Sequence, residues 1–320
     1  MRHRLAPFIA LLIALAAVVA ACGSSTSGDI DPYRIASDAS KAALDPVQVN
    51  VGFEVKDGAT TVTVDPSAFG FVVDHDAGTG ALHVSVPTAA LGMEAKDLAD
   101  LGITGSTVDF DIVYDGNGLY ARSPILATVL TMVLQPSGDL PSGDLTGWLR
   151  LGTKADLAGL LDQFGKSGSV PSFAAPSPGD ATSLKAALTD AGITLKLAGI
   201  EQHDGSDAYH LTVAVDGTKV LASKMFDSVT RTQLDEMTTA LKEVTISGDI
   251  WIDKASNHVV EVDGHIVAVK DATQTANITI KIGSPDGSVS TEAPGTFVDV
   301  PLKSIVTNLM TLIGQGLTGA

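Results

Sequence analysis

Residues 47–56 read VQVNVGFEVK, and this segment decides which kind of fold the chain can adopt. Its apolar residues stand at every second position from Val47 to Val55, with polar residues or glycine between them. Successive side chains of a β-strand point to opposite faces, so the alternation predicts a half-buried antiparallel strand. The residues that we expect to face the core are Val49, Val51, Phe53 and Val55.

The same alternation recurs six times further along the chain, and Asp-Gly pairs are interspersed with these segments. Aspartate and glycine tolerate the positive φ angles that tight hairpin turns require. The pattern therefore predicts a strongly curved antiparallel sheet with one apolar face. The alternating segments are residues 69–73, 82–86, 108–114, 211–215, 246–252 and 278–282, and the pairs begin at Asp57, Asp115, Asp204, Asp216, Asp263 and Asp286.

Helical spacing of apolar residues interrupts the strands in five places. In the last of these, Leu302, Ile305 and Leu309 share one stripe, which is typical of an amphipathic helix. Neither half of the chain is bounded by a clear linker, so we favour one continuous sheet over a duplicated sheet-plus-helix unit. The predicted helices span residues 124–134, 154–164, 183–191, 219–243 and 302–313, and the predicted loops span residues 135–147 and 165–180.

The N-terminus has the pattern of an export signal. Residues 2–4 read RHR, and the uncharged apolar stretch from Leu5 to Val19 is shorter than the roughly 20 residues of a membrane span. Residues 19–22, VAAC, resemble a lipobox, which implies cleavage before Cys22 after a diacylglyceryl group has joined its sulfur. The alternative is an ordinary secretory signal with a cysteine near its cleavage site. We predict a signal peptide at 1–21, an acylated cysteine and tether at 22–30, and one domain at 31–320.

Cys22 is the only cysteine in the chain. The domain that follows it therefore has no disulfide, no cysteine-ligated metal and no catalytic thiol. A single cysteine at this position is best explained by acylation, and residues 23–28, GSSTSG, then form a flexible tether of at most about 20 Å. We expect a protein anchored to the cell membrane by lipid, on the extracytoplasmic face.

The chain is strongly acidic, with 37 acidic and 20 basic residues and a formal net charge of −17. Removing residues 1–21 takes away two arginines and no acid, so the mature charge is −19. Such a surface excludes nucleic acid as a partner and is repelled by anionic headgroups. Attachment to the membrane must therefore come from acyl chains on Cys22.

Several motifs of catalysis or metal binding are incomplete. The segment Gly159–Ser167 is one residue too long for a phosphate loop, and Asp74–Gly78 resembles the start of a calcium loop but has Ser85 at the twelfth position. The seven histidines lack zinc spacing, and His203 and His210 are predicted to flank a hairpin turn. No Gly-x-Ser-x-Gly motif occurs. We predict no enzyme activity, no cofactor and no metal.

Two longer segments carry a family resemblance. Residues 195–216 read LKLAGIEQHDGSDAYHLTVAVD, and residues 245–266 read TISGDIWIDKASNHVVEVDGHI. With WLRL at 148–151 and Ala-Pro at 293–294, they resemble the mycobacterial LppX/LprG (LppX_LprAFG) lipoprotein family. The resemblance covers most of residues 45–305 and is best in the C-terminal half. It implies a LolA/LolB-like fold, a curved antiparallel half-barrel of the α+β class with helices covering the concave face.

The resemblance also implies a function. Members of that family bind lipids or lipoglycans and help to move them toward the outer envelope, so the predicted partners are acyl chains, the membrane and an envelope transporter. An envelope scaffold or assembly factor with a packed core is the alternative. The helix at 124–134 is predicted as part of the wall or lid of a cavity. The other predicted wall residues, with Leu126 and Leu130 of that helix, are Phe53, Phe71, Phe110, Ile112, Val213 and Ile250.

Overall fold

The computed structural model describes residues 31–42, 44–91, 93–135, 138–156, 180–222 and 241–300. These residues form two compact units. The first unit takes its residues from Met1–Leu44, Val49–Pro66 and Pro171–Ser284, and the second from Asp45–Gln48, Ser67–Val170 and Pro285–Ala320. Several predicted features lie outside the described residues. They are the signal peptide, Cys22, the tether, the helix predicted at 302–313, most of the helix predicted at 154–164, and the segment Gly159–Ser167. The single domain at 31–320 stays a prediction.

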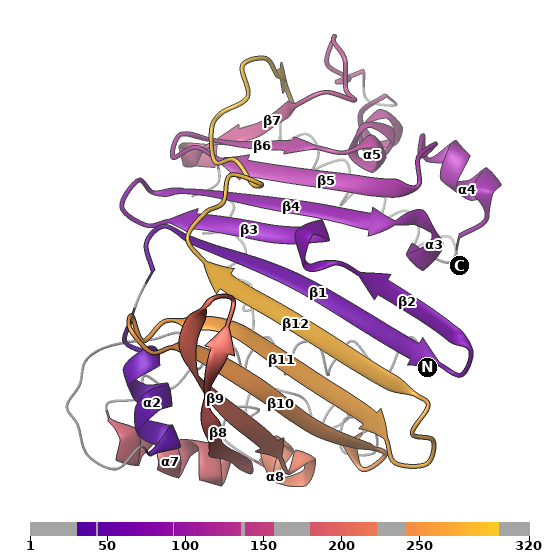
Figure 1. Cartoon of the computed structure of the whole chain (residues 1–320). Helices are drawn as coiled ribbons and strands as arrows, with labels where there is room; N and C mark the ends of the chain where they lie inside the picture. The colour runs from indigo at the N-terminus through magenta and orange to yellow at the C-terminus, as the bar shows by residue number, and fades with distance from the viewer. Residues whose placement is uncertain are drawn as a thin grey trace. The chain divides into compact units, whose positions relative to one another are not determined.

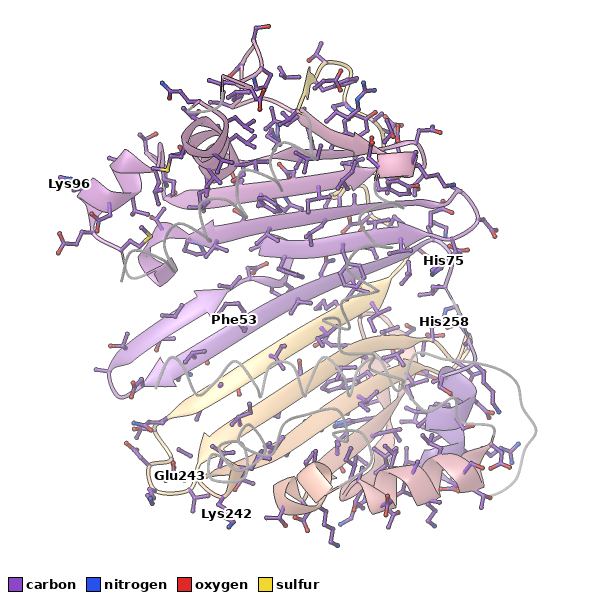
Figure 2. The ribbon with its side chains drawn as sticks, turned by 180° about the vertical axis from the view of Figure 1, so that it is seen from behind. Phe53, His75, Lys96, Lys242, Glu243 and His258 are labelled. Atoms are coloured by element: carbon purple, nitrogen blue, oxygen red, sulfur yellow. The ribbon has the colours of Figure 1, made fainter. Side chains whose placement is uncertain are left out.

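The first unit contains an antiparallel sheet whose strands follow the order β1-β12-β11-β10-β9-β8, with β2 paired to β1 (Figure 1). Figure 2 shows Phe53 on β1 from the opposite side. The alternation of apolar and polar residues predicted four of these strands, and all four are present as β1, β9, β10 and β12. The strands are β1 (Val47–Asp57), β2 (Thr60–Val64), β8 (Ile193–His203), β9 (Ser206–Val215), β10 (Val244–Asp253), β11 (Val259–Ala268) and β12 (Thr275–Gly283).

The core of the first unit lies on one face of this sheet. Leu211 and Ile250 are at most 1% exposed within it. Helices α2 (Pro32–Ala39), α7 (Ala181–Asp190) and α8 (Gly217–Ala222) add apolar side chains to the same cluster. Three of the four residues predicted to face the core from β1 pack against it, and Phe53 is half-buried. Those three are Val49, Val51 and Val55.

The second unit contains strands in the order β13-β7-β6-β5-β4-β3. All of its pairs are antiparallel except β13 with β7, where Arg150 and Asp299 form a bidentate ion pair at 2.5 and 2.9 Å. The strands are β3 (Phe69–Asp74), β4 (Thr79–Pro87), β5 (Thr107–Tyr114), β6 (Gly118–Arg122), β7 (Leu149–Thr153) and β13 (Val298–Asp299). The helices are the 3₁₀ turn η1 (Pro66–Ala68), α3 (Thr88–Leu91), α4 (Ala95–Asp100) and α5 (Pro124–Leu134). Pro66 itself is the last residue of the first unit's segment Val49–Pro66.

The open, mostly antiparallel sheets and few helices confirm the predicted α+β class. Helix α5 has the predicted bounds, and α7 begins two residues early and ends one residue early. Of the helix predicted at 219–243, residues 219–222 lie in α8, and residues 241–243 are the only others described. None of the helices within the described ranges is both long and apolar enough to cross a membrane.

The Asp-Gly pairs have three different structures. Those at Asp57, Asp115 and Asp204 join hairpins, as predicted. The prediction of a hairpin turn at Asp216 is wrong, because helix α8 begins at the next residue. The Asp216 side chain accepts a hydrogen bond from the Thr218 N–H at 3.2 Å, at the start of this helix. Aspartate is favoured at the N-cap of a helix as well as in turns, so the pair alone is ambiguous.

The turn predicted at Asp263 is also wrong, because this pair lies inside β11. Gly264 stands opposite Gly248 of β10, where an added Cβ would come within 2.6 Å of the Asp263 carbonyl oxygen. Close backbone approach therefore requires glycine at position 248 of β10, and the Asp263-Gly264 pair is part of the strand that approaches it. The hairpin between β10 and β11 instead includes Asn257 with φ of 59°. The pair at Asp286 forms a turn in the loop that follows β12.

Candidate apolar pocket

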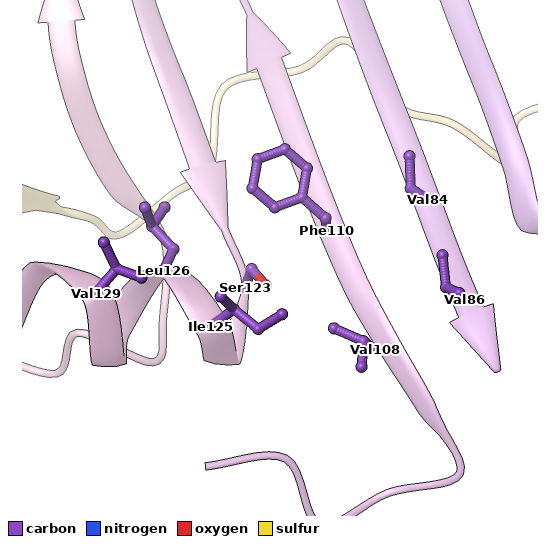
Figure 3. Close-up of a pocket in the computed structure, with 8 residues that line it drawn as sticks. All are labelled: Val84, Val86, Val108, Phe110, Ser123, Ile125, Leu126 and Val129. Atoms are coloured by element: carbon purple, nitrogen blue, oxygen red, sulfur yellow. The ribbon is translucent and has the colours of Figure 1, made fainter. Parts of the chain in front are cut away.

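A pocket of about 320 Å³ lies in the second unit between helix α5 and strands β4 and β5 (Figure 3). Seven of its eight lining side chains are apolar, and Ser123 is the exception. None of these eight described residues is charged. The lining residues are Val84 and Val86 of β4, Val108 and Phe110 of β5, and Ser123, Ile125, Leu126 and Val129 at and after the start of α5.

Strand register brings the sheet side of the pocket together. Val84 lies opposite Phe110, and Val86 lies opposite Val108. Residues two apart on a strand share a face, so these four side chains form one apolar surface. The alternation that makes these segments strands is thus the same feature that makes the wall apolar.

Helix α5 supplies the other wall because it is apolar around most of its circumference. One side buries Leu130 and Leu134 against Leu149 and Val300, where all four are at most 3% exposed. A neighbouring side of the helix is left for the pocket, and Val129 on that side is 39% exposed. The helix therefore has more apolar surface than the described residues cover.

A side-chain hydrogen bond holds α5 beside the loop that follows α4. The Thr128 hydroxyl donates to the Leu101 carbonyl oxygen at 2.9 Å. Next to it, Gly102 has a φ of 75°, a left-handed conformation that favours glycine. The start of α5 is therefore tied to the chain at a point outside the sheet.

Charged groups occupy the opposite face of β4, β5 and β6. Asp111 is buried, and it accepts hydrogen bonds from Arg122 at 2.7 and 3.0 Å. Its other oxygen lies 2.7 Å from His83 Nδ1. The Arg122 guanidinium also covers the Trp148 ring at 5.0 Å. These charged side chains are therefore separated from the pocket by the thickness of the sheet.

The predicted wall residues are distributed over both units. Phe110 and Leu126 line the pocket. Leu130 is buried on the other side of α5, and Val213 and Ile250 are buried in the core of the first unit. The contact of all eight residues with a ligand stays a prediction. The remaining three, Phe53, Phe71 and Ile112, are half-buried on β1, β3 and β5.

Sequence reasoning named Phe110 and Leu126 and predicted a wall formed by the helix that also contains Ile125 and Val129. It missed the other four lining residues, which are Val84, Val86, Val108 and Ser123. The signals for the strand residues were present, because 82–86 and 108–114 alternate clearly. What was missing was the register that places β4 beside β5 and both of them under α5.

A second cluster, His203, Asp204 and Glu261, lies in the first unit, with potential metal-ligand atoms within 4.8 Å of one another. The Lys281 ammonium lies 3.2 Å from Glu261 and 3.4 Å from Asp204. Burial alone would lower the pKa of Lys281, but these two carboxylates raise it. A cation is therefore already present at the carboxylates, which favours an ion-pair network over a metal site.

The segments that carry the family resemblance form this network. His203 and His210 flank the β8–β9 hairpin turn, as predicted, and stack on Trp251 with ring centroids 4.8 Å away. The Trp251 indole N–H donates to Glu201 at 2.7 Å. His210 also pairs with Asp249 at 2.7 Å. These residues cross-link strands β8 to β10 and lie outside the pocket lining, so their role here is structural.

Asp263, on β11, has a buried oxygen without a hydrogen-bond partner among the described residues. Burial raises the pKa of its carboxyl above the ordinary value of 3.8, against a hydrogen bond from Thr279 that lowers it. An acid with a raised folded-state pKa loses stability when it ionises. We expect Asp263→Asn to have a higher Tm than the wild type at pH 7, with the difference vanishing near pH 3.

The matched control for Asp263 is Asp249→Asn on the neighbouring strand. Asp249 accepts from His210 and lies 3.4 Å from His265, so losing its charge should lower the Tm at pH 7. Thermal unfolding followed by circular dichroism at both pH values checks the pair. A lower Tm of Asp263→Asn at pH 7 would contradict the burial argument.

The fold and the pocket together define a class, an α+β protein with open antiparallel sheets and an apolar pocket under a helix. No family model and no curated protein matches the chain. Among solved structures it is similar to lipoprotein LppX of Mycobacterium tuberculosis, at 15% identity and a TM-score of 0.35 over 82% of this chain and all of that one. It is also similar to LprF of Mycobacterium bovis, at 12% identity and a TM-score of 0.36, over 85% of this chain and all of that one. A LolA superfamily protein of Nitrosomonas europaea is a third similar structure, at 8% identity and a TM-score of 0.18, over 76% of this chain and 87% of that one.

Proposed function

We propose that this chain is a membrane-anchored lipoprotein that binds an acyl chain of a lipid or lipoglycan in the α5 pocket and carries it across the cell envelope. The observation that carries the proposal is that seven of the eight described lining residues are apolar and none of the eight is charged. Each methylene group moved from water into such a site contributes about 0.8 kcal/mol. Binding can therefore be strong without an ion pair.

The volume of the pocket supports a single chain. Ligand pockets commonly measure about 300–1,000 Å³, and this one, at about 320 Å³, is near the small end. We therefore expect one acyl chain to enter, with the headgroup outside. The exposed side chains of Val129 and Met132 on α5 provide further apolar surface along the helix.

Anchoring through Cys22 completes the proposal. Two acyl chains hold a protein stably on a membrane, whereas one gives only marginal binding. The acidic surface gives no electrostatic attraction to anionic lipid, so the anchor and the pocket have separate roles. The protein would then work on the extracytoplasmic face, with an envelope transporter as a partner.

A scaffold with a packed core is the second candidate. In its favour, Val213 and Ile250 are at most 3% exposed, and neighbouring side chains of the first unit fill the space around them. On this alternative the full-length protein would carry no lipid from its host. Extraction of the purified protein followed by lipid mass spectrometry separates the two candidates.

Filling the pocket should weaken acyl binding. We expect Val86→Trp to lower the affinity for a fluorescent fatty-acyl probe at least tenfold, because excluding two methylene groups already removes about 1.6 kcal/mol. The full-length protein is titrated with the probe, and circular dichroism checks folding, since overpacking can cost about 1–3 kcal/mol.

The matched control is Ser85→Trp. Ser85 is the preceding residue of β4 and points to the other face, where its hydroxyl donates to Asp109 at 2.6 Å. The same bulky side chain there should leave probe affinity unchanged. Equal affinities of the two folded variants would place the binding site elsewhere, and a wild type that neither binds the probe nor carries lipid would favour the scaffold.

A further inference from the structure

The one polar side chain in the pocket lining is unpaired. Ser123 is 1% exposed, and its hydroxyl oxygen has no hydrogen-bond partner among the described residues. Leaving a buried hydroxyl unsatisfied costs about 1–3 kcal/mol. Such a group calls for a partner that the described chain does not supply.

Ser123 would ordinarily satisfy its hydroxyl at the helix that it precedes. It is the N-cap residue of α5, a position where a serine oxygen commonly accepts from an N–H of the first turn. Here the backbone is extended, with φ of −169°, and no such capping bond forms. Its hydroxyl therefore remains available to donate as well as to accept.

The start of α5 places further polar groups next to the Ser123 hydroxyl. The 11-residue helix has Pro124 at its first position, and the N–H groups of Ile125 and Leu126 have no intrahelical acceptor. All three of Ser123, Ile125 and Leu126 line the pocket. Figure 3 shows Ser123 at the beginning of the helix, beside Ile125 and near Leu126. The positive end of the helix dipole therefore lies beside the Ser123 hydroxyl, and the rest of the lining is apolar.

We infer that the Ser123 hydroxyl donates a hydrogen bond to the carbonyl oxygen of an ester-linked acyl chain bound in this pocket. The inference rests on the proposed function and specifies its ligand. A neutral ester is favoured over a carboxylate because none of the described residues that line the pocket is cationic, and an unpaired buried charge is costly. A plain hydrocarbon would leave the hydroxyl unsatisfied.

The test uses the full-length protein in nanodiscs, with binding to empty nanodiscs subtracted. Three radiolabelled probes of one chain length are compared: methyl palmitate, palmitate and hexadecane. The wild type should bind methyl palmitate most tightly. Ser123→Ala should weaken methyl palmitate about tenfold, the effect of one buried hydrogen bond of about 1.4 kcal/mol, and leave hexadecane unchanged or bound more tightly.

Ser123→Thr, which keeps the hydroxyl, should restore the preference for the ester, and thermal unfolding shows whether each variant is folded. If Ser123→Ala weakens all three probes equally, or leaves the ester preference intact, the hydroxyl does not contact the carbonyl and the inference is overturned. Tighter binding of palmitate than of its methyl ester would overturn the choice of a neutral ligand. If the wild type binds none of the probes, it is the proposed function that fails.

Discussion

Replacing Val213 by aspartate is expected to unfold the first unit. Val213 is 3% exposed on β9, opposite Leu195 of β8 and Gly248 of β10, and belongs to the apolar core. The change removes about 1.5–3 kcal/mol of apolar burial and places an uncompensated charge in the core. We expect the free energy of unfolding to fall by more than about 4 kcal/mol, a loss that few single substitutions cause.

The control is the same substitution at the next residue. Ala214 is exposed on the other face of β9, so its aspartate variant keeps its charge in water. Urea denaturation of both proteins, followed by circular dichroism, should show a large loss for Val213→Asp and a change within about 0.5 kcal/mol for Ala214→Asp. Similar losses at the two positions would contradict the assignment of faces.

Cys22→Ala is expected to abolish acylation completely. Alanine has no sulfur to carry a diacylglyceryl group, and no other cysteine in the chain can replace it. Cleavage by lipoprotein signal peptidase, which the lipobox resemblance implies, should then fail as well. Metabolic labelling with a fatty-acid analogue should give no signal, and the intact mass should include residues 1–21.

Ser24→Ala is a suitable control, because it changes the tether and leaves the thiol in place. It should label like the wild type and lose residues 1–21. Label on the Cys22→Ala protein would show that acylation occurs elsewhere, and an unlabelled but shortened wild type would favour an ordinary secretory signal.

Strong periodicity made the main elements predictable. The strand predicted from Val47 to Val55 extends to Asp57, and the helix predicted at 124–134 has those bounds. The strand signal comes from burial of one face, and the helix signal comes from burial of most of the helix surface. Burial of this kind restricts the residue types at many positions at once. The turn predictions at Asp216 and Asp263 failed because two residues carry too little information to distinguish a turn from the start of a helix or the interior of a strand.

The pocket could be predicted only in part. Phe110 and Leu126 follow from the apolar faces of a strand and a helix, and both line it. Val213 and Ile250 have the same kind of pattern, yet they lie in a filled core. Alternation shows that a side chain faces inward, but it does not show what fills the space there.

The sequence by itself determined the seven strongly alternating strands, the apolar face of each and the hairpin turns at Asp57, Asp115 and Asp204, because these depend on the nature of near neighbours along the chain. Only the tertiary structure decided that Val84 stands opposite Phe110 and that α5 lies across both strands. It also decided that the Ser123 hydroxyl finds no hydrogen-bond partner within the described part of the chain. Register and helix placement arise from contacts between residues far apart in sequence, whose pairing no local pattern specifies.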